Sequence, residues 1–195
     1  MASSQNISHI LETERLVLRP FREEDLGLIQ TLYGDAKLLR FTPFDTMTPE
    51  QARSHLERII RDWDQLPLRS MEFAMVRKPE AAEEEKIGRC HILIDPETET
   101  GMIGWLIRRE YQGQHFALES GKALIRCCFE ALGLHRANAV CHPENPASRR
   151  VLERLGMRQE AHYIRKCRYT KNGSISWEDE VEYALLASEY AHSSC

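Results

Sequence analysis

The sequence feature that most constrains the fold is an apolar strand followed by a short loop and a helix. Residues 102–107 are strand-like, residues 108–115 form a polar loop, and helical spacing of apolar residues begins near Phe116. The first N–H groups of a helix lack intrahelical partners and lie at the positive end of its dipole. Such a junction can therefore bind pyrophosphate. It is also common as a plain connection, so the neighbouring motifs must decide its role.

Periodicity predicts the remaining elements. Expected strands cover 14–20, 71–77, 87–94, 102–107 and 137–141, and expected helices cover 26–34, 49–63, 116–133 and 145–156. Thr48 and Gln51 form a capping box with Pro49 at the first helical position. Asn172-Gly173 favours a tight turn between strands 163–169 and 177–186. The order of elements predicts one mixed α/β (α+β) domain.

Length and charge restrict the class of protein. The 195 residues are enough for one core, and 42% apolar with 29% charged residues is typical of a water-soluble protein. A formal net charge of -4 argues against a nucleic-acid partner. No apolar run reaches the roughly 18 residues of a membrane span, and residues 1–9 lack the pattern of a signal peptide. We therefore expect a cytoplasmic protein without a membrane partner.

The cysteines and histidines do not form a metal motif. Six cysteines lie at positions 90, 127, 128, 141, 167 and 195, without a CxxC pair. The pairs Cys90-His91 and Cys141-His142 could supply ligands only from neighbouring strands, and adjacent strand residues point to opposite faces. We expect reduced thiols and no metal.

Four motifs resemble one family. Residues 103–107 (IGWLI), followed by 111–117 (YQGQHFA), resemble the coenzyme A motif of the GNAT superfamily of N-acetyltransferases. Residues 145–148 (NPAS) and 151–157 (VLERLGM) are similar to that family's next helix. Residues 13–20 and 177–186 resemble the RimJ/RimL-like ribosomal-protein N-terminal acetyltransferases. The resemblance covers about residues 12–190 of a single 1–195 domain, and implies a mixed, mostly antiparallel central sheet flanked by helices.

The resemblance also implies a reaction and a site. Acetyl-CoA is the co-substrate, and the acetyl group passes directly to a primary amine, either a protein N-terminal α-amine or a small-molecule amine. Ser148 protonates the leaving thiolate, Asn145 orients the pantetheine or a water, and the Leu106 backbone N–H stabilises the oxyanion. As helix-start residues, Asn145 and Ser148 could equally serve as caps. The implied cofactor-binding residues are Trp105, Leu106, Ile107, Gln112, Gly113, Gln114, His115, Phe116, Ala117, Asn145 and Arg149.

Further charges are expected around the nucleotide. Arg108 or Arg109 and Lys122 add positive charge near the pyrophosphate, and Arg149 or Arg150 meets the adenosine 3′-phosphate. The three tryptophans, at positions 63, 105 and 177, are expected in the core rather than at a substrate platform.

Two departures from the family pattern keep an alternative open. His115 replaces a central loop glycine, and a non-glycine residue in a left-handed conformation costs about 1–2 kcal/mol, or roughly five- to thirtyfold in affinity. Cys167 stands where the subgroup has a carboxylate base, so His142, His91, Glu160 or a water chain must take the amine's proton. The alternative is an acyl-CoA-binding regulatory module that has lost turnover. The chain could be a monomer or a homodimer.

Overall fold

One eight-stranded sheet organises the computed structural model, which describes residues 9–78 and 84–193. The strand order is β1-β2-β3-β4-β5-β6-β8-β7. All neighbours are antiparallel except β5 and β6, which are parallel. This arrangement confirms the expected α+β fold. The bounds are β1 (Leu11–Glu12), β2 (Leu16–Pro20), β3 (Ser70–Arg77), β4 (Glu85–Asp95), β5 (Thr100–Ile107), β6 (Arg136–Cys141), β7 (Arg158–Lys171) and β8 (Ser174–Leu186).

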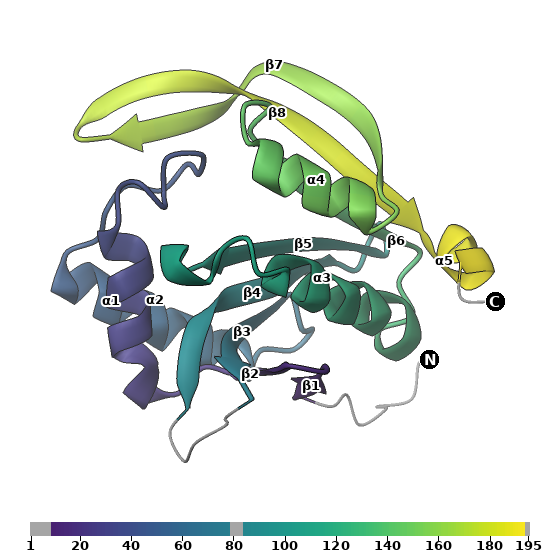
Figure 1. Ribbon diagram of the computed structural model, residues 1–195, viewed down its shortest axis with the longest axis horizontal. Helices are drawn as coiled ribbons and strands as arrows, with labels where there is room; N and C mark the ends of the chain where they lie inside the picture. The colour runs from purple at the N-terminus through teal and green to yellow at the C-terminus, as the bar shows by residue number, and fades with distance from the viewer. Residues whose placement is uncertain (1–8, 79–83, 194–195) are drawn as a thin grey trace.

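Helices cover the sheet on both faces and make two separate cores (Figure 1). Helices α1 (Leu26–Gly34) and α2 (Pro49–Asp62) enclose one core with Ala74 of β3. Helices α3 (Phe116–Arg126) and α4 (Pro146–Arg154) enclose the larger core on the opposite face. The short α5 (Ala187–Ser193) follows β8. Within the described residues, no helix is both long and apolar enough to cross a membrane.

Local sequence signals account for the helix ends. At the start of α2, Thr48 Oγ1 accepts from Gln51 N at 3.3 Å, and Gln51 Oε1 accepts from Thr48 N at 2.8 Å, confirming the capping box. Helix α3 is shorter than expected because residues 127–131 continue it as a π-helical turn. Gly133, with φ of 64°, then turns the chain toward β6.

The structure departs from the sequence prediction at the periphery. The hairpin is longer than expected, since β7 begins at Arg158 and β8 at Ser174. Trp177 is 56% exposed on this projecting hairpin, so its prediction as a core residue was wrong. Trp63 is half-buried against Phe73, and its indole donates to the Glu72 carbonyl. Strands β1, β4 and β5 and helix α5 include residues that periodicity missed. The sequence also predicts an acidic loop over 79–86, and residues 79–83 of it lie outside the described residues.

Candidate functional site

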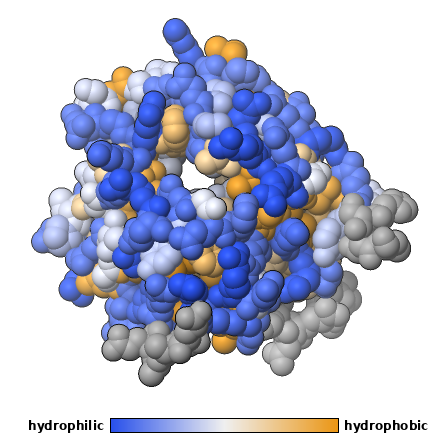
Figure 2. Space-filling model, in the orientation of Figure 1, coloured by the Kyte–Doolittle hydropathy of each residue, from blue (hydrophilic) through white to orange (hydrophobic). Residues whose placement is uncertain are grey.

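The sheet opens between β5 and β6. These strands pair only from Thr100 to Met102 against Arg136 to Asn138. Beyond that point β5 stays paired with β4 along its whole length, while β6 stays paired with β8. The second half of β5 therefore faces a V-shaped gap, which we call the V. Figure 2 shows the surface hollowed near the centre of the view, over the region where β5 and α4 lie in Figure 1.

The register of β4 and β5 decides which backbone groups face the V. Arg108 N donates to Ile87 O at 2.9 Å, and hydrogen-bonded pairs alternate along an antiparallel ladder. The N–H of Leu106 consequently points at Arg89 of β4, whereas those of Trp105 and Ile107 point into the V. This corrects the prediction of Leu106 as the oxyanion donor: its N–H faces the wrong strand, and Ile107 is the better-placed residue.

The loop after β5 has the conformation of an anion-binding turn. Gln112 Nε2 donates to Ile107 O at 2.9 Å, so this side chain caps the strand end. Gly113 and His115 have left-handed φ angles of 77° and 67°. His115 is the N-cap residue of α3, and its side chain makes no capping bond. The N–H groups of the first turn, starting at Phe116, therefore lack intrahelical partners.

Arg15 of the N-terminal segment anchors this loop. Its guanidinium donates to Gln114 O at 3.1 Å and lies 4.4 Å from the centre of the Phe116 ring. It also pairs with Glu119 of α3 at 2.6 Å, and Thr13 donates to the same carboxylate. Burial raises the pKa of Glu119, but the bonds from Thr13 and Arg15 outweigh it and lower the pKa. The loop is thus held from outside, which leaves its N–H groups unobstructed.

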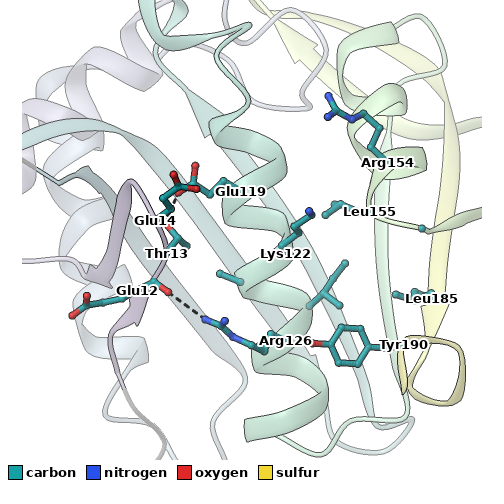
Figure 3. A pocket seen from close by; sticks show the side chains of 13 residues that line it. Glu12, Thr13, Glu14, Glu119, Lys122, Arg126, Arg154, Leu155, Leu185 and Tyr190 are labelled. Carbon is teal, nitrogen blue, oxygen red and sulfur yellow. Dashed lines mark hydrogen bonds between the residues drawn. The ribbon is translucent and has the colours of Figure 1, made fainter. Parts of the chain in front are cut away.

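A cavity of about 590 Å³ lies beside α3, between that helix and the end of α4 (Figure 3). Lys122 points from α3 toward Leu155, while Arg154 reaches from α4 toward the start of α3. Arg154 Nη1 lies 3.2 Å from His115 Nδ1. Lys122 has no hydrogen-bond or ion-pair partner within the described part of the chain. Lys122, Arg126 and Arg154 therefore give the lining of the cavity three cations, beside apolar residues such as Leu155 and Leu185.

Helix α4 places its first residues at the V. Asn145 Oδ1 accepts from Ser148 N at 3.2 Å, which is the capping arrangement that the sequence left open. Ser148 is half-buried and shares a helix face with Val151 and Leu155, which pack on the core. Arg149 is directed away from the cavity, because its Nε donates to Tyr183 of β8 at 3.2 Å. Arg149 as a cofactor ligand stays a prediction, and Arg154 is better placed for that role.

On the α1 and α2 face of the sheet, the hairpin tip meets the loop after α1. Tyr169 donates to Phe41 O at 3.1 Å, Lys171 Nζ to Leu39 O at 3.0 Å and to Phe44 O, and Asn172 N to Asp45 at 2.7 Å. These contacts close one side of the entrance to the V. We call this side the acceptor face.

Three glutamates line β8 on the acceptor face: Glu178, Glu180 and Glu182. They alternate along the strand, which places all of them on one side. Glu180 accepts from Lys166 at 2.7 Å and from Cys167 Sγ at 2.9 Å. Glu182 accepts from Tyr163 and Asn138, each at 2.9 Å. Sequence reasoning missed this row, although its alternation within an expected strand was a readable signal.

The expected proton acceptors are unequally placed. Burial, with the nearby Arg89, lowers the pKa of His91 to about 3, and Arg89 Nη2 lies 3.0 Å from its Nδ1. Glu160 is paired with Arg136 at the other end of β6. His142 follows β6, but its Nδ1 accepts from Glu144 N at 3.1 Å, and its Nε2 lies 3.6 Å from Glu178. Burial and the bond to Glu180 raise the pKa of Cys167 to about 11, so this thiol stays protonated at neutral pH.

The remaining expected charges lie at the loop's edge. Arg109 pairs with Asp35 at 2.6 Å, and Arg108 pairs with Glu110 at 2.5 Å. Both guanidinium groups are therefore already neutralised locally. Among the described residues, no three His, Cys, Asp or Glu side chains gather as a metal site.

Comparisons with known proteins place these features in one family. The family model of the acetyltransferase (GNAT) domain matches residues 15–158. The N-acetyltransferase p20 of Bacillus licheniformis, itself uncharacterized, is 32% identical over 185 residues, covering 93% of this chain and 98% of that protein. YnaD of Bacillus subtilis, also an uncharacterized N-acetyltransferase, is 28% identical over 180 residues, with 92% and 98% coverage.

Solved structures agree with this fold. A GNAT acetyltransferase from Bacillus anthracis superimposes with a TM-score of 0.79 at 26% identity, covering 92% of this chain and 99% of that one. RimL, an α-N-acetyltransferase of ribosomal protein L7/L12 solved with coenzyme A, has a TM-score of 0.74 at 19% identity, with 91% and 97% coverage. At that identity the second likeness shows the shared fold alone.

Proposed function

This chain belongs to the GNAT family of N-acetyltransferases, and on that premise we propose that acetyl-CoA binds through the V and donates its acetyl group to a primary amine on the acceptor face. GNAT enzymes use acetyl-CoA. The observation that carries the proposal is the V itself, in which the N–H groups of Trp105 and Ile107 have no strand partner among the residues that the structure describes. Unpaired backbone groups in a sheet need a partner, and an extended amide-bearing chain such as pantetheine supplies one.

The residues around the V fit the rest of coenzyme A. The first N–H groups of α3, together with the left-handed turn at Gly113 and His115, form a concave set of donors for pyrophosphate. The cavity is lined by α3 residues from Glu119 onward, just beyond the first residues of that helix, and it presents Lys122 and Arg154, of which Arg154 contacts His115 of the turn. Its cations suit the adenosine 3′-phosphate, and its apolar floor suits the adenine ring.

The reaction needs from this chain a donor to the oxyanion, a proton for the leaving thiolate and an acceptor for the amine's proton. Acetyl-CoA supplies a thioester whose carbon the amine attacks. Ile107 N–H stabilises the developing oxyanion, because it already points into the V. Ser148 lies at the start of α4 and donates a proton to the departing thiolate. Asn145 fixes the position of Ser148 through the helix cap.

Glu180 is the residue that we assign to proton removal from the amine. It precedes Val181, which pairs with Cys141 at the end of β6, so its carboxylate lies beside the V. Cys167, at the expected base position, holds its proton and donates to Glu180 instead. A carboxylate can draw a proton from an ammonium through one water. The sequence-level candidates His91 and Glu160 are engaged elsewhere.

The acceptor is a cationic amine, either a protein N-terminal α-amine or a small-molecule amine. Lys166 pairs with Glu180 at 2.7 Å and Arg136 with Glu182 at 3.2 Å, so the row formed by Glu178, Glu180 and Glu182 has three carboxylates for two cations. The remaining negative charge attracts a cation to the acceptor face. The aromatic rings of Phe41 and Tyr169 stand at the same entrance, with His142 between them. A RimJ/RimL-like choice of a protein N-terminus is one form of this proposal.

A second candidate is an acyl-CoA-binding module without turnover. The protonated Cys167 thiol at the expected base position favours it. The two candidates agree on coenzyme A binding and differ only on amine-dependent transfer.

One experiment tests both. Thermal unfolding is measured with and without acetyl-CoA, while thiol release is followed with a panel of amines and N-terminal peptides. A ligand at a hundredfold its Kd stabilises by about 2.7 kcal/mol, or about 5–10 °C for a chain of this size. Stabilisation with amine-dependent release supports the enzyme, stabilisation without release supports the binding module, and no shift at millimolar acetyl-CoA refutes both.

Glu180→Gln tests the proton acceptor. We expect kcat to fall about 10²- to 10⁴-fold at neutral pH with acetyl-CoA affinity unchanged. The control is Asp179→Asn, on the opposite face of β8, where Asp179 pairs with His162 at 2.9 Å. Equal activity in the two variants would remove Glu180 from the mechanism.

A further inference from the structure

His115 makes a contact that a glycine in the same loop position could not make. Its Nδ1 lies 3.2 Å from Nη1 of Arg154, 39 residues along the chain. The arginine belongs to the last turn of α4, and the histidine is the residue before α3. The contact therefore joins two helices at the end of the cavity where Arg154 is drawn in Figure 3.

The backbone at this position disfavours a residue with a side chain. His115 has φ of 67° and ψ of 8°, a left-handed conformation that glycine adopts freely. Its ring is exposed and caps no helix N–H. Arg154 has no acceptor atom, so the imidazole accepts at an unprotonated Nδ1. Among the described residues, the imidazole contacts the Arg154 guanidinium, so the contact with Arg154 is the one that can explain why a side chain is present here.

Lys122 is a second cation in the lining of the same cavity. Lys122 points toward α4 from the facing wall of the cavity, and its ammonium has no partner within the described residues. Three carboxylates also line the cavity, those of Glu12, Glu14 and Glu119. Arg15 pairs with Glu119 at 2.6 Å and Lys78 with Glu12 at 3.1 Å, so two of the three are already paired with cations. Two cations on opposite walls suit a phosphate monoester, which accepts hydrogen bonds from both.

We infer that His115 is a positioning residue that holds the Arg154 guanidinium over the cavity, where it and Lys122 bind the 3′-phosphate of coenzyme A. This inference rests on the proposed function, because it requires coenzyme A in the V. Without the imidazole, the long arginine side chain samples many rotamers and must be ordered by the ligand. His115 therefore contributes discrimination between coenzyme A and its 3′-dephospho form.

The test compares the affinities of coenzyme A and 3′-dephospho-coenzyme A by titration calorimetry on the full chain. We expect Arg154→Ala to lose about tenfold in coenzyme A affinity while dephospho-coenzyme A binding changes less than about twofold. His115→Gly should lose much of the preference for coenzyme A over 3′-dephospho-coenzyme A, although glycine suits the left-handed backbone of the loop better than histidine does. Asparagine tolerates the left-handed conformation, and its Oδ1 lies where Nδ1 of histidine lies. His115→Asn should therefore retain the preference.

Arg61→Ala, at the end of α2 on the other face of the sheet, is the matched control and should behave as the wild type. A wild type that binds neither nucleotide would overturn the proposed function and this inference together. Coenzyme A binding with an unchanged preference in His115→Gly would overturn only the inference. Equal loss in the glycine and asparagine variants would also overturn it, because the acceptor atom would then be irrelevant.

Discussion

Replacing Asp25 with asparagine should destabilise the fold strongly, because this carboxylate is fully buried among donors. Its two oxygens accept from Arg19 at 2.8 and 3.0 Å, from Lys86 at 2.7 Å and from Arg22 N at 2.8 Å. Arg19 is itself only 3% exposed. An asparagine would remove the charge and turn an NH₂ group toward groups that can only donate.

The magnitude follows from the burial of the pair. Removing one partner of a buried ion pair costs about 3–5 kcal/mol. Glu84 also bonds Arg19, at 2.5 Å, so the arginine keeps one counter-charge and we expect the lower end, about 3 kcal/mol. That corresponds to a fall in Tm of about 6–12 °C. Urea unfolding at pH 7 measures it, with the exposed Glu24→Gln of the same turn as a control that should cost less than about 0.5 kcal/mol.

The loss of stability caused by Asp25→Asn should become smaller as the pH falls. Burial raises the pKa of Asp25, but the bonds from Arg19, Lys86 and Arg22 outweigh it and hold the pKa below its usual value. A lowered folded-state pKa gives stability that is complete above the unfolded value, about 3.9, and is lost as the pH falls through the folded value. The difference between wild type and Asp25→Asn should therefore be constant from pH 5 to 7 and shrink below about pH 4. A difference under 1 kcal/mol at pH 7 would refute this reasoning.

Three further outcomes are expected. Gly88→Ala should lower the free energy of unfolding by about 1–3 kcal/mol, because its Cβ would lie 2.5 Å from the Leu106 carbonyl oxygen of β5, the strand beside the V. Calorimetry should also show weaker coenzyme A binding. The control Gly27→Ala should change neither quantity, because its Cβ would enter open space. Thr48→Ala should cost about 1 kcal/mol in urea unfolding and leave kcat unchanged, since it removes only a helix cap. Ser148→Ala should lower kcat about tenfold by thiol release without changing coenzyme A affinity, and an unchanged kcat would remove its proton-donating role.

The sequence specified the parts of this fold that depend on local spacing. The strand, loop and helix around Ile107 to Phe116 were predictable because a period of two gives way to a period near 3.6 within a few residues. The capping box at Thr48 was equally local. Trp177 was misplaced because an apolar residue in a strand is buried only where another layer covers that face, and the hairpin projects beyond the core.

The candidate site was less predictable because its geometry is set by strand register. The direction of the Leu106 N–H depends on which residues of β4 lie opposite, and no local pattern contains that information. The pairing of His115 with Arg154 likewise depends on how two helices approach across 39 residues. The alternation of Glu178, Glu180 and Glu182, in contrast, is a local pattern, and it could have been recognised in the sequence although it was missed.

The short parallel pairing of β5 and β6 has a consequence for amide hydrogen exchange. Within residues 9–78 and 84–193, the strand pairing that joins the half of the sheet containing β4 to the half containing β8 consists of three residue pairs. In the free protein the Trp105 and Ile107 amides should exchange rapidly, whereas the Leu106 amide between them, bonded to β4, should be protected. A ligand that occupies the V should slow the two outer amides and leave the middle one unchanged. Such a ligand would also couple the two halves of the sheet, so that they unfold as one cooperative unit.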